Sequence, residues 1–223
     1  MNRPFDVYES QDRIISRRVL FAIELLDAVT LDRVSQGVDV QAHGLQGKPI
    51  VNAGRLFVWL NEDIGQLERI SIDPRTLPYE EIELERTQLQ VPLTSIELSP
   101  RVDYPFNVGI TGLRGTLVED RYRSEPVLDA EVRLRWLDQD GNWLDAPTRS
   151  HTAAKGGDFV AILRFAPSDG PQLDATKRKL TVRLRVRRGE DERGSVDLTV
   201  PQGRVTRLST PNQFVFAWDE LEP

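Results

Sequence analysis

Short runs in which apolar and polar residues alternate recur along this sequence, and they constrain its fold more than any other feature. The clearest run is residues 130–136, where Val132, Leu134 and Trp136 alternate with charged side chains. This period of two is typical of a half-buried β-strand. Residues 19–26 also fit a helical period, but their β-branched side chains favour a strand. The sequence therefore predicts an all-β protein with few or no helices.

The runs follow one another in the same order in two halves of the chain. Residues 113–118 correspond to residues 19–26, and the later runs correspond in sequence order: 129–136 to 37–42, 157–165 to 54–60, 180–186 to 67–73 and 194–201 to 80–85. Roughly seven short strands in a unit of about 100 residues are typical of a small antiparallel β-sandwich. We therefore expect two such sandwiches in tandem.

The boundaries of these units follow from the segments that lack the alternating pattern. We expect residues 1–16 to form an N-terminal arm and residues 17–100 the first sandwich. Residues 101–108 are then a linker, and residues 109–223 form the second sandwich with its C-terminal tail. The linker contains Tyr104 and Phe106, and these aromatic side chains indicate that it packs against the sandwiches.

Composition and charge exclude several classes of site. The chain has no cysteine, so it holds neither disulfides nor thiolate metal sites. Its net charge of −6 argues against general nucleic-acid binding, because there is no excess of cations to displace phosphate counterions. The first residues lack the apolar stretch of a secretory signal, and no apolar run approaches the ~20 residues that span a bilayer. We therefore expect a protein made in the cytoplasm that does not insert into membranes.

No set of residues has the spacing of a catalytic, cofactor or metal site. His43 and His151 are the only histidines, and neither has a second histidine or a cysteine near it in the sequence. Residues 44–49 resemble a phosphate loop, but Pro49 replaces the required serine or threonine. Residues 138–142 fit a hairpin turn better than a calcium loop, because the distal glutamate is missing. We find no nucleophile motif, so we predict that the protein is not an enzyme and has no cofactor or metal.

A basic stripe is the first candidate for binding a partner. Arg183, Arg185 and Arg187 alternate along one face of a predicted strand. They fit an acidic surface on a partner, or acidic neighbours within the same sheet. Residues 133 and 135 are also arginines and fall beside the stripe if the two strands share a sheet. Acidic pairs such as residues 80–81 are read as solvated faces.

Aromatic residues are the second candidate. Trp59 and Trp136 lie in apolar runs and are expected in the core, whereas Trp143 and Trp218 are expected to be the more exposed tryptophans. Partial packing of each over a neighbouring loop is favoured over a role in binding a protein or a sugar. We expect a chain truncated before residue 212 to fold but not to assemble. The predicted partner-binding residues are Arg183, Arg185, Arg187, Trp143, Phe214, Phe216 and Trp218.

Turn and core residues of the second half resemble those of the carboxypeptidase regulatory-like domains. The matching segments are residues 115–120 (GTLVED), 126–132 (PVLDAEV) and 157–159 (GDF), and the first half matches more weakly. This resemblance implies a transthyretin-like β-sandwich, also called prealbumin-like, in each half. Residues 104–109 (YPFNVG) resemble the joint of accessory proteins encoded with phage-tail-like contractile injection systems.

These observations together predict a non-enzymatic structural or adaptor protein. Its two sandwiches are expected to contact other protein subunits of a larger assembly, which the second resemblance implies is phage-tail-like. A chain made in the cytoplasm then becomes part of a particle released from the cell. The alternative is a carbohydrate-binding module with Trp143 as its platform. The sequence sets neither the oligomeric state nor the identity of the partner.

Overall fold

The computed structural model describes eight stretches of the chain: residues 18–60, 64–90, 92–122, 125–153, 156–165, 169–176, 178–207 and 215–223. All strands and turns below lie within these stretches. The only helical segments there are single 3₁₀ turns, such as η1 (Ile64–Gln66) and η2 (Arg86–Gln88). No helix in these stretches is long and apolar enough to cross a membrane. The all-β prediction is confirmed.

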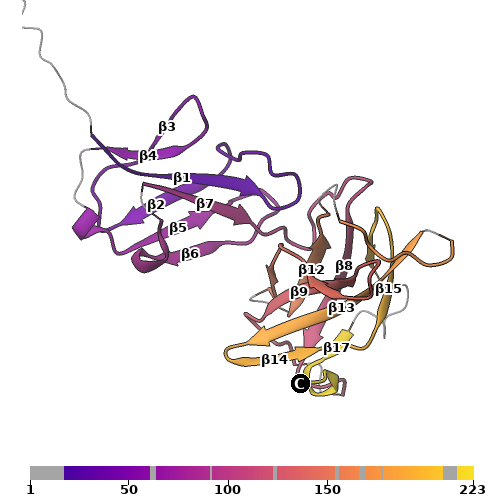
Figure 1. Ribbon diagram of the computed structural model, residues 1–223. Helices are drawn as coiled ribbons and strands as arrows, with labels where there is room; N and C mark the ends of the chain where they lie inside the picture. Colours follow the sequence, from indigo (N-terminus) through magenta and orange to yellow (C-terminus); the bar gives the residue numbers. More distant parts are fainter. Residues whose placement is uncertain are drawn as a thin grey trace, which may run out of the picture.

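The first half contains seven described strands: β1 (Val19–Asp27), β2 (Asp39–His43), β3 (Ile50–Val51), β4 (Phe57–Leu60), β5 (Arg69–Asp73), β6 (Ile82–Glu85) and β7 (Leu93–Leu98). They form one sheet in the order β3-β4-β1-β7 and a second in the order β2-β5-β6 (Figure 1). Phe21 and Ile23 of β1 are buried between these sheets with Ile70 and Ile72 of β5. The ring of Phe21 stacks on Trp59 at a centroid distance of 4.6 Å.

The second half contains the remaining strands: β8 (Thr111–Val118), β9 (Glu131–Leu137), β10 (Trp143–Asp145), β11 (Ser150–His151), β12 (Asp158–Leu163), β13 (Lys179–Arg188), β14 (Asp191–Gly194), β15 (Leu198–Pro201), β16 (Val205–Arg207) and β17 (Val215–Ala217). One sheet has β9 and β13 at its centre, and the other has β8 between β12 and the two strands β16 and β17. Val132, Leu134 and Trp136 of β9 are buried between these sheets, as their alternation predicts.

The two halves share one pairing pattern. β1 pairs antiparallel with β4 and parallel with β7, and β8 pairs antiparallel with β12 and parallel with β16 and β17. The β2–β5 pair is matched by β9–β13, and each is extended at the second strand, by β6 in one half and by β14 and β15 in the other. The predicted correspondence of strands is therefore confirmed. The parallel pairs, by contrast, were not indicated by the sequence pattern.

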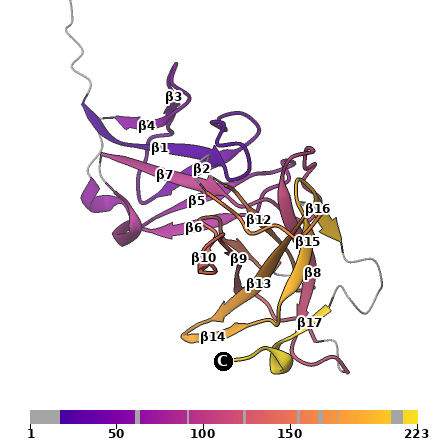
Figure 2. The ribbon, with the colours of Figure 1, turned by 45° about the vertical axis from the view of Figure 1, so that its right-hand side comes forward.

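Strand β12 packs against both halves of the chain, because each of its two faces is buried in a different hydrophobic cluster. Phe159, Ala161 and Leu163 face the core of the second half. Val160 and Ile162 point the other way and belong to the hydrophobic cluster of the first half, where they are 1% and 4% exposed. In Figures 1 and 2 the first half, in indigo and purple, meets the second half beside β12. The boundaries predicted for the two units, and their folding as separate units, stay predictions.

Candidate functional site

The predicted arginine stripe lies on the outer face of β13, directly beside arginines of β9. Arg183 is opposite Arg135, and Arg185 is opposite Arg133. These four guanidinium groups and that of Arg187 form ion pairs with carboxylates in or next to the same sheet: Arg183 with Asp197 (2.6 Å), Arg135 with Asp145 (2.9 Å), Arg133 with Glu131 (2.9 Å), Arg187 with Glu131 (2.7 Å), and Arg185 with Glu192. An acidic partner has to compete with these internal carboxylates. The partner-binding role of the stripe stays a prediction.

Glu131 is the centre of this charged face. Its carboxylate forms ion pairs with Arg133 and Arg187, and a longer ion pair of 3.4 Å with Arg149. Burial raises the pKa of Glu131, but the charges of Arg149 and Arg187 and the hydrogen bond from Arg133 outweigh it. The pKa is therefore held below its ordinary value, and the carboxylate stays ionised where three cations converge.

Trp143 is half-buried, and one face of its indole is covered by an arginine. The guanidinium carbon of Arg183 lies 4.3 Å from the ring centroid, a cation–π contact. A sugar ring that stacks on this indole has to displace Arg183 or use the other face. Trp143 therefore packs against a neighbouring residue, as was considered for it from the sequence. Its role in carbohydrate binding stays untested.

The C-terminal segment is part of the second core, so the expected exposure of Trp218 is wrong. Trp218 is 8% exposed and Leu221 is 7% exposed, and both belong to the hydrophobic cluster of the second half. Phe216 is half-buried, and its ring centroid lies 5.8 Å from that of Phe159. The parallel pairing of β17 with β8 carries these residues into the core. Phe214 lies outside the described residues.

The histidines and the acidic hairpin have structural partners. Nε2 of His43 lies 2.9 Å from Oγ of Ser71, and His151 is exposed at the end of β11. Asp138 accepts the backbone N–H groups of residues 140 and 142 at 2.9 and 2.7 Å, which completes the predicted β9–β10 turn. These bonds, with Asn142 foremost, lower the pKa of Asp138. Within the described stretches no three His, Asp or Glu side chains are grouped as metal ligands.

A buried carboxylate fixes the junction between the halves. Asp27, at the end of β1, is 5% exposed and accepts hydrogen bonds from the hydroxyls of Tyr79 (3.0 Å) and Tyr104 (2.5 Å). It also accepts the backbone N–H of Val29 at 2.7 Å. Tyr104 belongs to the predicted linker, so the linker is tied to the first half by a charge-assisted hydrogen bond. Burial, followed by the hydrogen bond and charge of Asp27, raises the pKa of Tyr104 well above its usual range.

The side chains of three further residues hold the second half against the linker and the first half. Arg114 of β8 donates to the carbonyl of Tyr104 at 3.0 Å and lies over the ring of Phe106. Arg164 donates to the carbonyl of Ala28 at 3.1 Å and pairs with a glutamate of β7 at 3.2 Å. Ser99 donates to the carbonyl of Arg149 at 3.0 Å. The predicted packing of the linker is therefore present, through Tyr104 and Phe106.

An open cleft of about 910 Å³ lies beside this junction. It is lined by residues 80–84 in and before β6, by residues 96, 97 and 99 at the end of β7, and by residues 147, 149, 151 and 152 around β11. Each of these strands has a single strand neighbour in the described chain: β5 for β6, β1 for β7 and β9 for β11. Three sheet edges therefore converge on one cleft.

Sequence patterns indicated the junction and the cleft only weakly. Asp27 follows an apolar run, and an acidic residue at the end of a buried strand is a weak signal of a buried polar cluster. Glu80 and Glu81 were expected on a solvated face, but Glu80 is half-buried in the cleft. Burial raises the pKa of Glu80, and the nearby carboxylates add to this although Arg101 opposes it.

Comparisons with known proteins place the chain in no family. A scan against protein-family models finds no match, and a search of curated proteins finds none. One solved structure with some likeness is described as the structure of the streptococcal ancillary pilin, at 10% sequence identity and a TM-score of 0.25. The likeness covers 84% of this chain and 61% of the pilin chain. It is too weak to carry an argument, so the assignment of a β-sandwich protein is based on the strand pairing.

Proposed function

We propose that this protein is a non-enzymatic structural subunit or adaptor that contacts other proteins of an assembly. The observation that supports this best is the junction, where Asp27, Tyr79 and Tyr104 form a buried cluster and β12 is covered on both faces. A buried apolar interface between domains opposes the relative motion that flexible linkers permit. Two sandwiches held in this way present their surfaces at a fixed spacing, which is useful to a structural subunit.

The assembly is proposed to be phage-tail-like, with the protein made in the cytoplasm and then carried in a released particle. The support for this is the sequence resemblance of residues 104–109 alone. The resemblance to carboxypeptidase regulatory-like domains rests on turn and core residues. It therefore supports a structural role and does not indicate a catalytic or ligand-binding site. Fractionation of native cells, with the chain followed by an antibody, tests the location.

In vivo cross-linking of the full, tagged chain in its native cells tests the proposal. We expect purification under denaturing conditions to recover a cross-linked companion protein at a fixed ratio. A chain recovered only as an uncross-linked monomer contradicts an adaptor role. The same experiment with Arg183→Gln/Arg185→Gln tests the charged face, and Arg69→Gln/Arg178→Gln, which removes two exposed arginines elsewhere, is its matched control. Loss of the companion in the first variant alone assigns the contact to the face.

A further inference from the structure

The cleft at the junction has the backbone geometry of a site for an added strand. An edge strand directs the N–H and C=O groups of every second residue away from its neighbour, and these groups pair readily with an incoming extended segment. Edge β6 runs along the cleft, β7 borders it, and β11 closes it on the side of the second half. Ile82 and Leu84 of β6 are half-buried at this edge, and Ile96 of β7 is buried. They form an apolar floor for alternate side chains of a guest strand.

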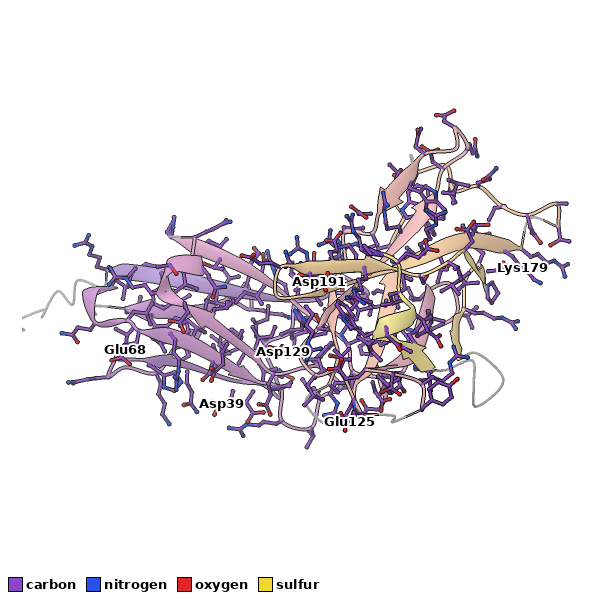
Figure 3. All side chains as sticks on the ribbon, turned by 90° about the horizontal axis from the view of Figure 1, so that it is seen from below. Asp39, Glu68, Glu125, Asp129, Lys179 and Asp191 are labelled. Atoms are coloured by element: carbon purple, nitrogen blue, oxygen red, sulfur yellow. The ribbon has the colours of Figure 1, made fainter. Side chains whose placement is uncertain are left out.

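The lining of the cleft carries an excess of negative charge. Its three arginines are each paired with a carboxylate outside the lining: Arg75 with Asp39 (3.2 Å), Arg101 with Asp103 (2.6 Å) and Arg149 with Glu131 (3.4 Å). Among its six carboxylates, Glu97 is paired with Arg164. Four others form no ion pair with any residue that the structure describes: Glu80, Glu81, Glu83 and Asp129. Figure 3 shows Asp129 where the two halves meet.

We propose that this cleft binds an extended segment of a partner protein in which apolar residues alternate with lysine or arginine. The segment adds to the free edge of β6, its apolar side chains pack on Ile82 and Leu84, and its cations reach Glu81, Glu83 and Asp129. This proposal deepens the adaptor function, on which it rests, by naming the surface and the chemistry of the partner. Main-chain pairing supplies the affinity, and side-chain charge selects the segment.

The second half also contributes a charged residue, Asp129, to the proposed site. Asp129 has φ +54°, a left-handed conformation that is uncommon for residues other than glycine, and its side chain is exposed at the cleft. The junction holds it at a fixed position relative to β6. A guest strand is therefore recognised by both halves at once, so binding depends on the junction as well as on the edge.

The test uses purified full chain and three labelled eight-residue peptides with blocked ends. The first alternates lysine and valine, the second alternates glutamate and valine, and the third is the lysine peptide with an N-methyl group on every residue. N-methylation keeps the side chains but removes the backbone donors along both edges. We expect fluorescence anisotropy at about 0.15 M salt to show binding of the first peptide only. Amide exchange of residues 81–85 should slow when that peptide is bound.

Matched variants locate the site. Glu81→Gln/Glu83→Gln should weaken binding about fivefold or more, in line with the loss of two exposed ion pairs. Glu68→Gln/Asp140→Asn removes two exposed carboxylates at the far ends of β5 and β9 from the cleft, and it should bind as the unaltered chain does. Figure 3 shows Glu68 far from Asp129 in that view.

Three outcomes overturn the proposal. Equal binding of the N-methylated peptide means that charge alone attracts the peptide, with no strand added. If both double variants lose the same amount of peptide affinity, the peptide is attracted by the whole acidic surface and not by the cleft. If the chain binds no peptide but associates with itself, and if this self-association is lost in Glu81→Gln/Glu83→Gln, then the cleft binds a second copy of the chain. The cross-linking experiment in native cells is independent of all three, so a failed cleft and a failed adaptor function are distinguishable.

Discussion

Gly115 lies in β8 where two phenylalanine rings from different strands meet the backbone. A Cβ at this position would lie 2.8 Å from Phe159 and 2.8 Å from Phe216, closer than real Cβ contacts allow. Gly115→Ala should therefore displace both rings and lower the free energy of unfolding by about 1–3 kcal/mol, measured by urea denaturation. Gly194→Ala is the control, because the nearest atom to its Cβ is 3.8 Å away, and it should change stability by less than about 0.5 kcal/mol. Equal effects of the two variants would contradict the packing at Gly115.

Tyr79 and Tyr104 should make the free energy of unfolding depend on pH in the alkaline range. Burial and the adjacent Asp27 raise the pKa of both hydroxyls in the folded state, while the unfolded value is about 10. Above about pH 10 the unfolded chain releases protons that the folded chain retains, so stability is fully present below this pH and falls as the pH rises. The fall is at most about 1.4 kcal/mol per pH unit for each tyrosine.

Urea unfolding of the full chain between about pH 8 and about pH 11 measures this dependence. In Tyr79→Phe/Tyr104→Phe the alkaline slope should flatten, and stability at neutral pH should drop because Asp27 loses two donors. Tyr122→Phe is the control, since Tyr122 is 98% exposed, and it should keep the slope of the unaltered chain. A slope unchanged in the double variant would rule out the two tyrosines as its source.

At the scale of elements, alternation predicted the strands that have one buried and one charged face. β9 and β13 are examples, because each inward residue is apolar and each outward residue, apart from Leu137 at the end of β9, is polar or charged. β17 is too short for its sequence pattern to show which face is buried, so the burial of Trp218 was not expected. Trp218, which follows it, is buried through a parallel pairing with β8, about a hundred residues earlier in the chain. No local pattern encodes a pairing of that kind.

Trp218 and Trp143 provide a matched test of which tryptophan supports the fold. Trp218→Ala empties a position in the second core and should lower the free energy of unfolding by about 3–5 kcal/mol. Trp143→Ala removes a half-buried ring and one cation–π contact, so it should cost about 1 kcal/mol or less. Chemical denaturation followed by circular dichroism gives both values. If Trp218→Ala were as mild as Trp143→Ala, the C-terminal segment would not belong to the core, and a chain truncated before residue 212 would fold as first expected.

The whole molecule is where sequence reasoning is weakest, and the reason is again physical. The Asp27 cluster joins residues 52 and 77 positions apart, and such contacts depend on how the first half folds and how the linker packs against it. The cleft exists only because β6 and β11, which belong to different halves, lie near each other. One signal was available in the sequence: residues 158–163 include a run of five apolar residues, which favours a strand covered on both faces.

The two-sided burial of β12 predicts that the halves unfold together. Scanning calorimetry of the unaltered chain should show one cooperative transition, because Val160 and Ile162 make part of each half's stability depend on the other. Val160→Thr/Ile162→Thr places two hydroxyls in this apolar contact, so the transition should split in two and proteolysis within residues 101–108 should accelerate. Val196→Thr, at a site that is 64% exposed, should leave one transition. Two transitions in the unaltered chain would mean that the halves are independent, and the rigid spacing on which the adaptor function is based would then be lost.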